Sequence, residues 1–436
     1  MAEPVLRGLP SRALRIALLT HSVNPRGGVV HTVSLAEALH DQGHDVTVLA
    51  PATPGQTMFR PLRCGLSLVA VPATPPADVA EMVEARRDAF IGHLRRLIAE
   101  RPFEVLHAQD SISGNALATL RQQHEIDGFV RTVHHLDTFD DARLMAWQQR
   151  AFAEASQVLC VSAGWCGRLL LEHGIEAIEV QNGVDTQRFN PRPAASDAAL
   201  LQRLGLRAGA GSGGRSGLAP GFGMNAPLLL AVGGIEARKN TLAILRALVL
   251  LRRQQPGAQL VIAGGASLLD HGRYQAAFEA ERQALLTVAG GLTGPDLADA
   301  VRITGPLDDA LMPALYRAAD VLLMPSLTEG FGLAVLEALA SGTPVVASHR
   351  PPFTEYLAPG ESNGVCWADP AQPASIAAAA LRALQPGRAQ ALAAALPEVC
   401  RRYNWPASAR RHAAIYRAHL ALRASRRQSR ATSLAG

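Results

Sequence analysis

The sequence predicts an α/β protein with two domains, each built on a parallel sheet. Its 436 residues exceed the roughly 250 to 300 residues at which a single hydrophobic core stops growing. Short apolar runs alternate with longer helical patterns through both halves, which is the pattern of parallel α/β sheets. Hydrophobic residues make up 48% and charged residues 18% of the chain, as is typical of folded globular proteins. Two domains imply a cleft between them.

The first half contains six strand-like runs and ends in a change of composition. The runs are "LRIALLT", "HDVTVLA", "FEVLHA", "GFVRTVH", "QVLCVS" and "AIEVQNGVD", with helical patterns such as "VHTVSLAEALHDQG" and "GNALATLRQQ" between them. They predict an N-terminal Rossmann-like domain over residues 1–195. The pattern breaks at "FNPRP", and residues 205–225 are rich in Gly and Ser. We therefore expect a flexible insertion over 196–225.

The strand pattern resumes after the Gly-rich segment. The runs "PLLLAVGG", "AQLVIAGG", "VRITG", "ADVLLMPS" and "TPVVAS" predict a second Rossmann-like domain over 226–403. A helical pattern follows over 404–424, and the basic segment 425–436 is expected to be a disordered tail. Ligands of open parallel sheets bind outside the carboxyl ends of the strands, so motifs directly after these runs are expected to face the cleft.

Composition and charge exclude several classes of protein. The formal charge of +5 is small and spread along the chain, and aromatic residues are only 5%, so no nucleic-acid partner is expected. No apolar run reaches the ~18 residues of a membrane span, and the N-terminus does not have the pattern of a signal peptide; a cytoplasmic location is expected. The five cysteines lack CxxC spacing, which indicates neither a disulfide framework nor a zinc site.

A glycine-rich turn precedes a helix in "EGFGLAVLEALASG". Glycines on both sides of Phe331 let the backbone approach a ligand, and the N-terminus of the helix favours an anion such as phosphate. Glu329 lies before this helix and Glu337 eight residues later, so both carboxylates could address one ligand. The alternative is that Glu329 caps the helix and Glu337 is a solvated helix residue.

The segment "VGGIEARKN" holds Lys239, the only lysine among 42 Lys and Arg residues. Lysine offers a compact ammonium with rotatable donors, whereas arginine offers a rigid planar fork. A site shaped around a point charge on a phosphate need not accept arginine. Arg238 lies next to Lys239 in the same turn. The alternative is that one lysine remains by chance.

Together these segments resemble the family 4 glycosyltransferases, which are retaining enzymes of GT-B fold. Besides the two motifs above, the segments "VSAGWCGRLL", "QNGVDTQRFNP", "ITGPLDDALMPALYRAADVLLMPS" and "ASGTPVVAS" occur in the order of the family. The resemblance covers nearly the whole chain and is strongest over 158–190 and 226–356. It implies two Rossmann-like domains facing a central cleft.

The resemblance also implies a donor site in the second domain for a nucleotide diphosphate sugar. Lys239 corresponds to the lysine that binds the diphosphate, Glu337 to the carboxylate on the ribose, and Glu329 to the one near the transferred sugar. Further contacts are implied for the backbone amides of Phe331, Gly332 and Leu333 and for the turn from Gly305 to Leu307, which would pass the base. One departure is Gly234, where the family often has an arginine. Either Arg238 replaces that arginine, or Lys239 and the backbone amides hold the diphosphate alone.

In the first domain, the resemblance places Gly28 in a glycine loop beside the donor phosphates, with Arg26 next to it. A paired-glycine turn is common in loops in any case. The family places a histidine after the strand "GFVRTVH", close to the transferred sugar. His134 fits the T-x-H spacing best, and His135 is the runner-up.

Two aspartates in the first domain are candidates for acceptor hydroxyls. Asp110 follows the strand "FEVLHA", and Asp137 follows the histidine pair. Glu355 follows Pro351 and Pro352, where the family often has a glycine pair, so we assign it no role.

The sequence as a whole predicts a retaining glycosyltransferase with a nucleotide diphosphate sugar donor and a glycan, lipid or small-molecule acceptor. No His or Asp cluster has metal-ligand spacing, so neither a metal nor another cofactor is expected. The alternative is a catalytically silent sugar-nucleotide or glycan binding protein, motivated by Gly234. A dehydrogenase is excluded because no GxGxxG motif follows the first strand. The segment 404–424 resembles the family's closing helix, which packs back on the first domain. Its arginines allow weak peripheral contact with an anionic membrane surface, but a solvated helix face is the favoured interpretation.

Overall fold

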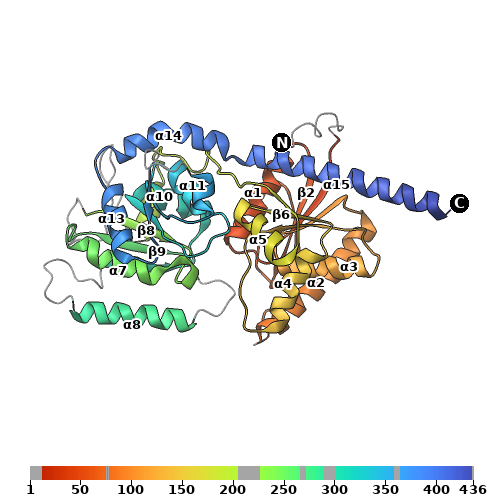
Figure 1. Cartoon of the computed structure of the whole chain (residues 1–436), viewed down its shortest axis with the longest axis horizontal. Coiled ribbons are helices and arrows are strands. Elements are labelled where there is room, and N and C mark those ends of the chain that lie inside the picture. The colour runs from red at the N-terminus through yellow and green to blue at the C-terminus, as the bar shows by residue number, and fades with distance from the viewer. Residues whose placement is uncertain are drawn as a thin grey trace. The chain divides into compact units, whose positions relative to one another are not determined.

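The computed structural model describes residues 12–74, 76, 78–204, 226–265, 272–288, 300–357 and 364–434. The chain divides into two compact units. The first unit comprises Met1–Gly183 with Trp405–Gly436, and the second comprises Val184–Asn404. Each unit is an α/β layer structure around its own sheet (Figure 1).

The first unit contains a seven-stranded sheet in the order β3-β2-β1-β4-β5-β6-β7. All neighbouring strands are parallel. The strands are β1 (Arg15–Leu19), β2 (Asp45–Ala52), β3 (Gly65–Ala70), β4 (Val105–Ala108), β5 (Val130–Val133), β6 (Gln157–Cys160) and β7 (Ala177–Glu179). The strand order reverses between β1 and β4, which makes this pair the topological switch point of the sheet.

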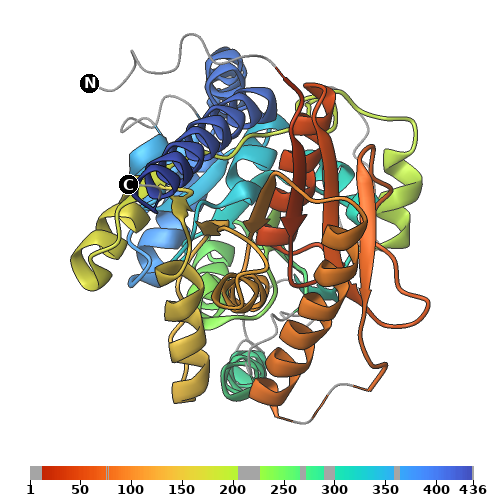
Figure 2. The same ribbon diagram turned by 90° about the vertical axis from the view of Figure 1, so that its right-hand side faces the viewer.

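Helices cover both faces of the first sheet. They are α1 (Gly27–Asp41), α2 (Val79–Glu100), α3 (Ser111–Gln122), α4 (Ala142–Ala153), α5 (Ala163–His173) and α15 (Trp405–Leu434). The helices α2, α3 and α4 pack in series, and α15 packs against α1. Figure 2 shows α15 (dark blue) and α2 (orange) on opposite sides of this sheet. Asp78, Asp110 and Asp141 cap α2, α3 and α4 by accepting backbone N–H groups, as is favourable at a helix N-terminus.

The second unit contains a six-stranded sheet in the order β10-β9-β8-β11-β12-β13, also parallel throughout. The strands are β8 (Leu228–Val232), β9 (Gln259–Ala263), β10 (Val301–Gly305), β11 (Val321–Met324), β12 (Val345–Ser348) and β13 (Val365–Ala368). The order reverses between β8 and β11, so the second unit has a switch point of the same kind as the first.

The helices of the second unit form two groups (Figure 1). They are α6 (Asp197–Arg203), α7 (Thr241–Arg252), α8 (Gly272–Val288), α10 (Met312–Ala318), α11 (Leu333–Ala340), α12 (Phe353–Tyr356), α13 (Pro373–Ala383) and α14 (Arg388–Arg402), with short 3-10 helices η2 (Ala237–Lys239) and η4 (Asp309–Leu311). The helix α7 packs against α13 and α8, and α11 packs against α10 and α14.

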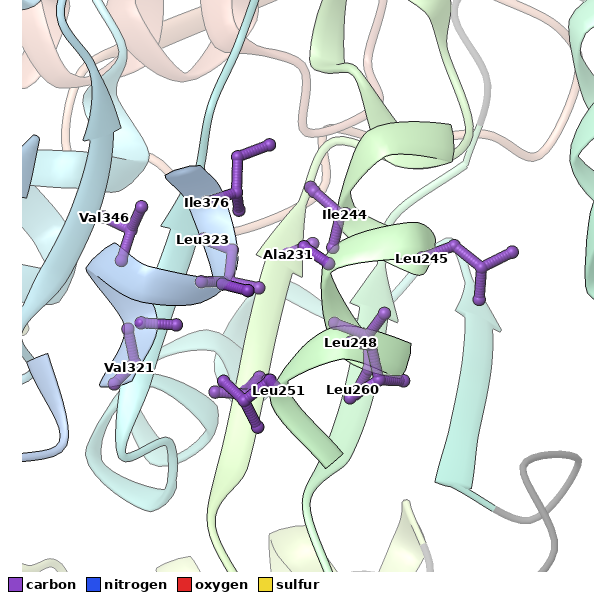
Figure 3. Packing of buried hydrophobic residues seen from close by; sticks show 14 of the residues in the cluster. Ala231, Ile244, Leu245, Leu248, Leu251, Leu260, Val321, Leu323, Val346 and Ile376 are labelled. Carbon is purple, nitrogen blue, oxygen red and sulfur yellow. The ribbon is translucent and has the colours of Figure 1, made fainter. Parts of the chain in front are cut away.

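The core of the second unit lies between its sheet and the pair α7 and α13. Figure 3 shows Ile244 and Leu248 of α7 over Ala231 of β8 and Leu260 of β9. These side chains are at most 3% exposed. Burying an aliphatic side chain of this size contributes roughly 1.5 to 3 kcal/mol. The apolar runs predicted as strands therefore form a buried sheet, and this sheet supports the loops of the second unit.

The boundary between the domains differs from the predicted one. The first unit ends at Gly183, not at residue 195, because Val184 forms a bridge with Asn404. The predicted flexible insertion over 196–225 begins with a helix, α6, whose Asp197 carboxylate is held by the Arg317 guanidinium at 2.6 Å. The Gly- and Ser-rich residues 205–225 lie outside the described residues.

The C-terminal prediction needs a second correction. The helix α15 continues to Leu434, whereas 425–436 was expected to be a disordered tail. The segment contains no Pro or Gly before Gly436, so nothing in its sequence breaks the helix. Among the described helices, none combines the length and the apolar character needed to cross a bilayer.

Candidate functional site

The switch point of the second sheet brings two sequence motifs together. The loop after β8 carries Gly233 to Asn240, and the loop after β11 carries Ser326 to Gly332. The two loops are tied by the Leu327 N–H, which donates to the Arg238 carbonyl at 2.8 Å. The carboxyl ends of β8 and β11 therefore hold the motifs that were expected to bind the donor.

Two glycines after β8 determine how closely the chain can pack there. Gly233 has φ +119°, and a Cβ at this position would lie 2.6 Å from Cε of Lys239. The Lys239 side chain thus lies directly over Gly233. Gly234 has φ +76°, and a Cβ there would lie 2.8 Å from the Gly265 carbonyl oxygen. Any side chain at 234 would require the backbone to move.

The central contact of this site is an ion pair between Lys239 and Glu329. The Lys239 Nζ lies 2.5 Å from Glu329 Oε1, and their side chains are only 11% and 6% exposed. The Ser326 hydroxyl donates to the same carboxylate oxygen at 2.9 Å. Charge-assisted hydrogen bonds of this kind are about twice as strong as neutral ones.

Arg238 adds a second cation beside Glu329. Its Nη1 lies 3.5 Å from Glu329 Oε2, and its Nε lies 2.9 Å from Glu236 Oε2. Burial alone would raise the pKa of Glu329, but the charges of Lys239 and Arg238 outweigh it, and the pKa of this carboxyl is lowered. Burial also lowers the pKa of Lys239, against the opposing effect of Glu329. The site thus contains two cations compensated by two acidic side chains.

The helix α11 begins where the second motif ends. Its N-cap is Gly332 with φ +88°, no side chain caps it, and its first turn holds no acidic residue. The Phe331 ring stacks on Tyr356 with centroids 4.5 Å apart. The backbone from Phe331 through Gly332 to Leu333 leads directly into a helix N-terminus, where free N–H groups favour an anion.

The structure decides between the alternatives for the two glutamates. Glu329 does not cap α11, because Gly332 is the N-cap and Glu329 is engaged by Lys239. Glu337 is half-buried, and its Oε2 accepts a hydrogen bond from the Tyr316 hydroxyl at 2.8 Å. Neither carboxylate is a simply solvated side chain.

Leu307 lies in the turn after β10, at the same edge of the sheet. The turn begins with Gly305 at φ +66°, and the Gly264 N–H donates to the Gly305 carbonyl at 3.0 Å. Pro306 packs against Gly265, where a Cβ would meet its ring at 2.8 Å. The turn expected to pass the base is therefore fixed against the end of β9.

In the first unit, Gly28 and His134 lie next to each other. A Cβ on Gly28 would lie 3.5 Å from Cδ2 of His134, and the His134 Nε2 lies 3.0 Å from Gln109 Oε1. Burial lowers the pKa of His134 well below its usual range, and the nearby His31 lowers it further. The imidazole is therefore held neutral, at the carboxyl end of β5.

The remaining candidates of the first unit have clear structural partners. His135 Nε2 lies 3.3 Å from Asp137 Oδ2, and the Asp137 backbone is held by Gln148 of α4 through two hydrogen bonds of 2.9 and 2.8 Å. Asp110 is the N-cap of α3, with its carboxylate on the Ser113 N–H and hydroxyl. A capping role accounts for Asp110 without a ligand, although its position at the end of β4 still faces the switch point.

Buried histidines continue behind His134. His31 lies 4.6 Å from His134 and 6.1 Å from His412 between ring centroids, and His107 lies 5.9 Å from His412. Each of His31, His107 and His412 is at most 1% exposed. Burial lowers the pKa of His31 to about 3 and that of His412 to about 4, and lowers the pKa of His107 well below its usual range. The cluster joins α1, β4 and α15.

Three residues of the second-unit site were not predicted from sequence. Ser326 and Tyr316 orient Glu329 and Glu337, and Asn240, in the left-handed region at φ 61°, donates to the carbonyls of Pro325 at 3.1 Å and Pro370 at 2.7 Å. Ser326 lies two residues after the end of β11, and a polar residue just past a buried strand is a signal that the sequence carries. Among the described residues, no group of three or more His, Cys, Asp or Glu is arranged to hold a metal ion.

Comparisons with known proteins agree with this geometry. Residues 219–395 match the family described as "Glycosyl transferases group 1", and residues 25–188 match "Glycosyltransferase Family 4". The chain is 29% identical over 400 residues, 90% of each chain, to a phosphatidyl-myo-inositol mannosyltransferase of Mycolicibacterium smegmatis.

Solved structures share the fold at low sequence identity. The sucrose-phosphate synthase of Thermosynechococcus elongatus superimposes with a TM-score of 0.72 at 23% identity, covering 93% of this chain and 99% of that one. HepE of Anabaena, solved with UDP and glucose, superimposes with a TM-score of 0.69 at 18% identity, covering 92% and 98%. The fold is GT-B, as predicted, and the chain belongs to the family 4 glycosyltransferases.

Proposed function

We propose that the protein transfers a sugar from a nucleotide diphosphate sugar to an acceptor hydroxyl with retention of anomeric configuration. The observation that carries this proposal is the buried Lys239–Glu329 pair, 2.5 Å between Nζ and Oε1, at the switch point of the second sheet. Departure of the diphosphate develops negative charge on the leaving group. A compact cation beside a helix N-terminus stabilises such charge without reorganising.

The donor would replace the ion pair rather than add to it. A diphosphate oxygen that approaches Lys239 competes with the Glu329 carboxylate for the same ammonium. Glu329 would then lose its contact with Lys239 and could accept hydrogen bonds from the hydroxyls of the transferred sugar. Ser326 and Arg238 would still orient its carboxylate. Phosphate oxygens would also accept hydrogen bonds from the backbone at Phe331 to Leu333.

The other donor contacts follow from the same edge of the sheet. Glu337, held by Tyr316, would accept the ribose hydroxyls, and the base would lie along the turn at Leu307. In the first unit, Gly28 leaves space beside His134, where the neutral imidazole would contact the transferred sugar. No metal is required in this scheme, because Lys239 and the N-terminus of α11 supply the positive charge.

Calorimetric titration with UDP, GDP and ADP, followed by an assay with the corresponding sugar nucleotides in EDTA, tests the proposal. Lys239→Met keeps the length of the side chain and removes its charge, so it should weaken nucleotide binding by at least about tenfold. The product should carry the donor's anomeric configuration in proton NMR. Nucleotide binding without product from any acceptor would favour a catalytically silent binding protein, and activity lost in EDTA would contradict metal independence. The name of the mannosyltransferase relative makes phosphatidyl-myo-inositol the first acceptor to assay.

A further inference from the structure

The side chain of Gln109 lies between two imidazole rings in the first unit. Gln109 directly follows β4, its backbone N–H donates to the Leu19 carbonyl at 2.9 Å, and it is only 3% exposed. Its Oε1 lies 3.0 Å from His134 Nε2, and its Nε2 lies 3.2 Å from His107 Nε2. One buried amide therefore joins the ring that follows β5 to a ring within β4.

This amide determines where the two rings carry their protons. An amide oxygen only accepts hydrogen bonds, and an amide nitrogen only donates them. The His134 Nε2 next to the Gln109 oxygen must therefore carry a proton, and the His107 Nε2 next to the amide nitrogen must be unprotonated. A neutral imidazole carries one proton, so His134 is the Nε2–H tautomer and His107 is the Nδ1–H tautomer.

The other partners of His107 fit this assignment. The Thr132 hydroxyl lies 2.7 Å from His107 Nε2, and the Tyr416 hydroxyl lies 2.7 Å from His107 Nδ1. A hydroxyl can donate or accept, so Thr132 donates to Nε2 and Tyr416 accepts from Nδ1–H. Both nitrogens of His107 are thus engaged. Among the described residues, His134 has a hydrogen-bond partner at Nε2 and none at Nδ1.

The surroundings of His134 favour the uncharged ring. Burial lowers its pKa most, and the pKa is lowered further by His31 of α1, Arg131 and His135 near β5, and His107 of β4. No acidic oxygen of the described residues lies within 4.0 Å of His134, whereas the neighbouring His135 has Asp137 Oδ2 at 3.3 Å. A carboxylate would orient the ring and also stabilise its charged form. An amide orients the ring without supplying a counter-ion.

We propose that Gln109 is a positioning residue for His134: its amide holds the ring as the Nε2–H tautomer, so that Nδ1 accepts a hydrogen bond from a hydroxyl of the transferred sugar while the ring stays uncharged. The inference rests on the proposed function, because it concerns the group of that reaction that contacts the sugar. The sugar gains positive charge as the diphosphate departs, and an imidazolium beside it would repel that charge. A neutral acceptor does not.

The tautomers can be measured in the full-length protein without any substrate. Long-range proton–nitrogen NMR spectra of protein labelled with nitrogen-15 histidine distinguish Nδ1–H, Nε2–H and imidazolium rings. His134→Asn and His107→Asn identify the two rings by loss of their signals. At pH 7.5 we expect His134 as Nε2–H and His107 as Nδ1–H. The reverse pair of tautomers, or an imidazolium at position 134, would overturn the proposal.

Gln109→Glu adds a charge and keeps the shape of the side chain. Its carboxylate can accept from His134 but has no donor for His107, so His107 should leave the Nδ1–H form. The carboxylate should also raise the pKa of His134. The fraction of charged His134 then grows as the pH falls through the raised pKa, so kcat should fall on the acid side between about pH 8 and 6. The parent should lack this loss.

Gln109→Met removes both hydrogen bonds and keeps the length of the side chain. The released ring should lower kcat by about ten- to a hundredfold. Calorimetric binding of UDP, GDP and ADP should be unchanged, because these nucleotides occupy the second unit. A purely structural defect would instead lower both. Transfer from UDP-glucose, GDP-mannose and ADP-glucose supplies the kinetics.

Gln157 supplies the matched control for the added charge. It begins β6, at the amino end of the same sheet, and its Nε2 donates to the Val158 carbonyl at 3.1 Å. Gln157→Glu should keep the tautomers and the pH profile of the parent. Equal acid losses in Gln157→Glu and Gln109→Glu would reduce the effect to added charge and overturn the proposal.

The spectra and the kinetics fail in different ways. Unchanged kcat and pH profile in folded Gln109→Met and Gln109→Glu proteins would overturn the positioning role. The parent spectra still decide the tautomers if a variant does not fold. The expected tautomers in a protein that transfers sugar from none of the three donors would refute the proposed function and leave the hold of Gln109 on His134 standing.

Discussion

The two units use the same position of the same kind of sheet in opposite electrostatic ways. At the second switch point each cation has an acidic neighbour within 4.0 Å: Lys239 meets Glu329, and Arg238 meets Glu236. In the first unit, Arg86 of α2 donates to the His21 carbonyl at 3.3 Å, and Arg131 of β5 is 4% exposed; neither has such a neighbour among the described residues. The second site is neutralised from within, so under the proposed function the diphosphate would exchange with an internal ion pair.

The difference has a thermodynamic consequence. Breaking a buried ion pair from one side leaves an uncompensated charge, which typically costs 3 to 5 kcal/mol. A ligand that replaces one partner avoids this penalty, so the Lys239–Glu329 pair can be stable when empty and still open for a diphosphate. Substitutions at the second site should therefore change the unfolding free energy and the nucleotide affinity by different amounts. Comparing single with double variants measures the two changes separately.

The largest expected effect is that of Lys239→Met. Loss of the ammonium should reduce transfer by on the order of 10³-fold, the range for a removed transition-state donor. It should also destabilise the second unit, because Glu329 remains buried with only Arg238 at 3.5 Å. Steady-state kinetics and urea unfolding measure the two effects.

The double variant Lys239→Met with Glu329→Gln separates the loss of transfer from the loss of stability. Removing both charges should restore most of the stability and none of the transfer, since a neutral pair carries no desolvated charge. If the double variant recovered activity, Lys239 would be a structural partner of Glu329 and not a ligand of the diphosphate.

The second prediction concerns acid and the first unit. In the fold, His31, His107 and His412 are held neutral by burial, which depresses their pKa values. The nearby cations Arg131 and Arg411 depress the pKa values of His107 and His412 further. In the unfolded chain each histidine titrates near the usual pKa of about 6.5.

The sign follows from these values. Below the unfolded pKa the unfolded chain binds protons that the fold excludes, so stability is present above about pH 6.5 and falls as the pH falls toward the depressed values. At pH 5.5 each histidine should cost about 1.4 kcal/mol of unfolding free energy. Urea unfolding at pH 7.5 and 5.5 measures the loss. His412→Gln should reduce the pH slope by about one proton, whereas His40→Gln, an exposed residue of α1, should leave the slope unchanged.

Tryptophan fluorescence can assign that acid loss to a unit. Trp147, Trp165 and Trp405 lie in the first unit, and Trp367 lies in the second. In a Trp367→Phe background the emission reports the first unit alone, and its transition should move with pH as the whole chain does. A pH-independent transition in that background would place the acid sensitivity elsewhere.

The third prediction concerns Gly234, where the family often has an arginine. Gly234→Arg should destabilise the second unit by about 1 to 3 kcal/mol, because φ is +76° and the Gly265 carbonyl lies 2.8 Å from the new Cβ. It should not improve nucleotide affinity. Arg238→Gln should weaken nucleotide binding by about tenfold, if Arg238 replaces the missing side chain. Tighter binding by Gly234→Arg would mean that the position is open and that Arg238 does not compensate.

The sequence predicts the strands and loops of the second-unit site but not the contact between its two central residues. The buried runs before Gly233 and before Ser326 have strand lengths, and turn signals follow them, so the α/β class and the loops at the carboxyl ends could be predicted. Lys239 and Glu329 could each be predicted as site residues from their motifs. Their direct pairing could not, because it joins residues 90 positions apart and depends on β8 and β11 being neighbours.

The failures have tertiary causes. The sequence predicts a flexible insertion where α6 lies, because this segment adjoins a Gly-rich stretch, yet Arg317, 120 residues later, fixes Asp197. The burial of Arg131 could not be predicted from the sequence, because alternation in a strand suggests a solvated side chain every second residue. In a sheet covered by helices on both faces that expectation fails, and the same residue becomes a buried cation.

The smallest expected effect lies at Tyr356. Its hydroxyl is buried and has no hydrogen-bond partner among the residues that the structure describes, and it lies next to Gly332 at the start of α11. Burial and the nearby Glu329 charge raise the pKa of this phenol, so it is a neutral donor. Tyr356 thus places a neutral hydroxyl beside the second switch point.

Tyr356→Phe should therefore change stability and binding in opposite directions. Removing an unsatisfied hydroxyl should raise the unfolding free energy by up to about 1 kcal/mol, while sugar-nucleotide affinity should fall by roughly three- to tenfold if the phenol donates to the donor. Tyr416→Phe is the matched control in the first unit: its hydroxyl is hydrogen-bonded to His107 at 2.7 Å, so its loss should cost about 1 kcal/mol and leave donor affinity unchanged. A Tyr356→Phe protein that is less stable and binds normally would show that the phenol has a structural partner, and the contrast between the two switch points would then rest on the ion pairs alone.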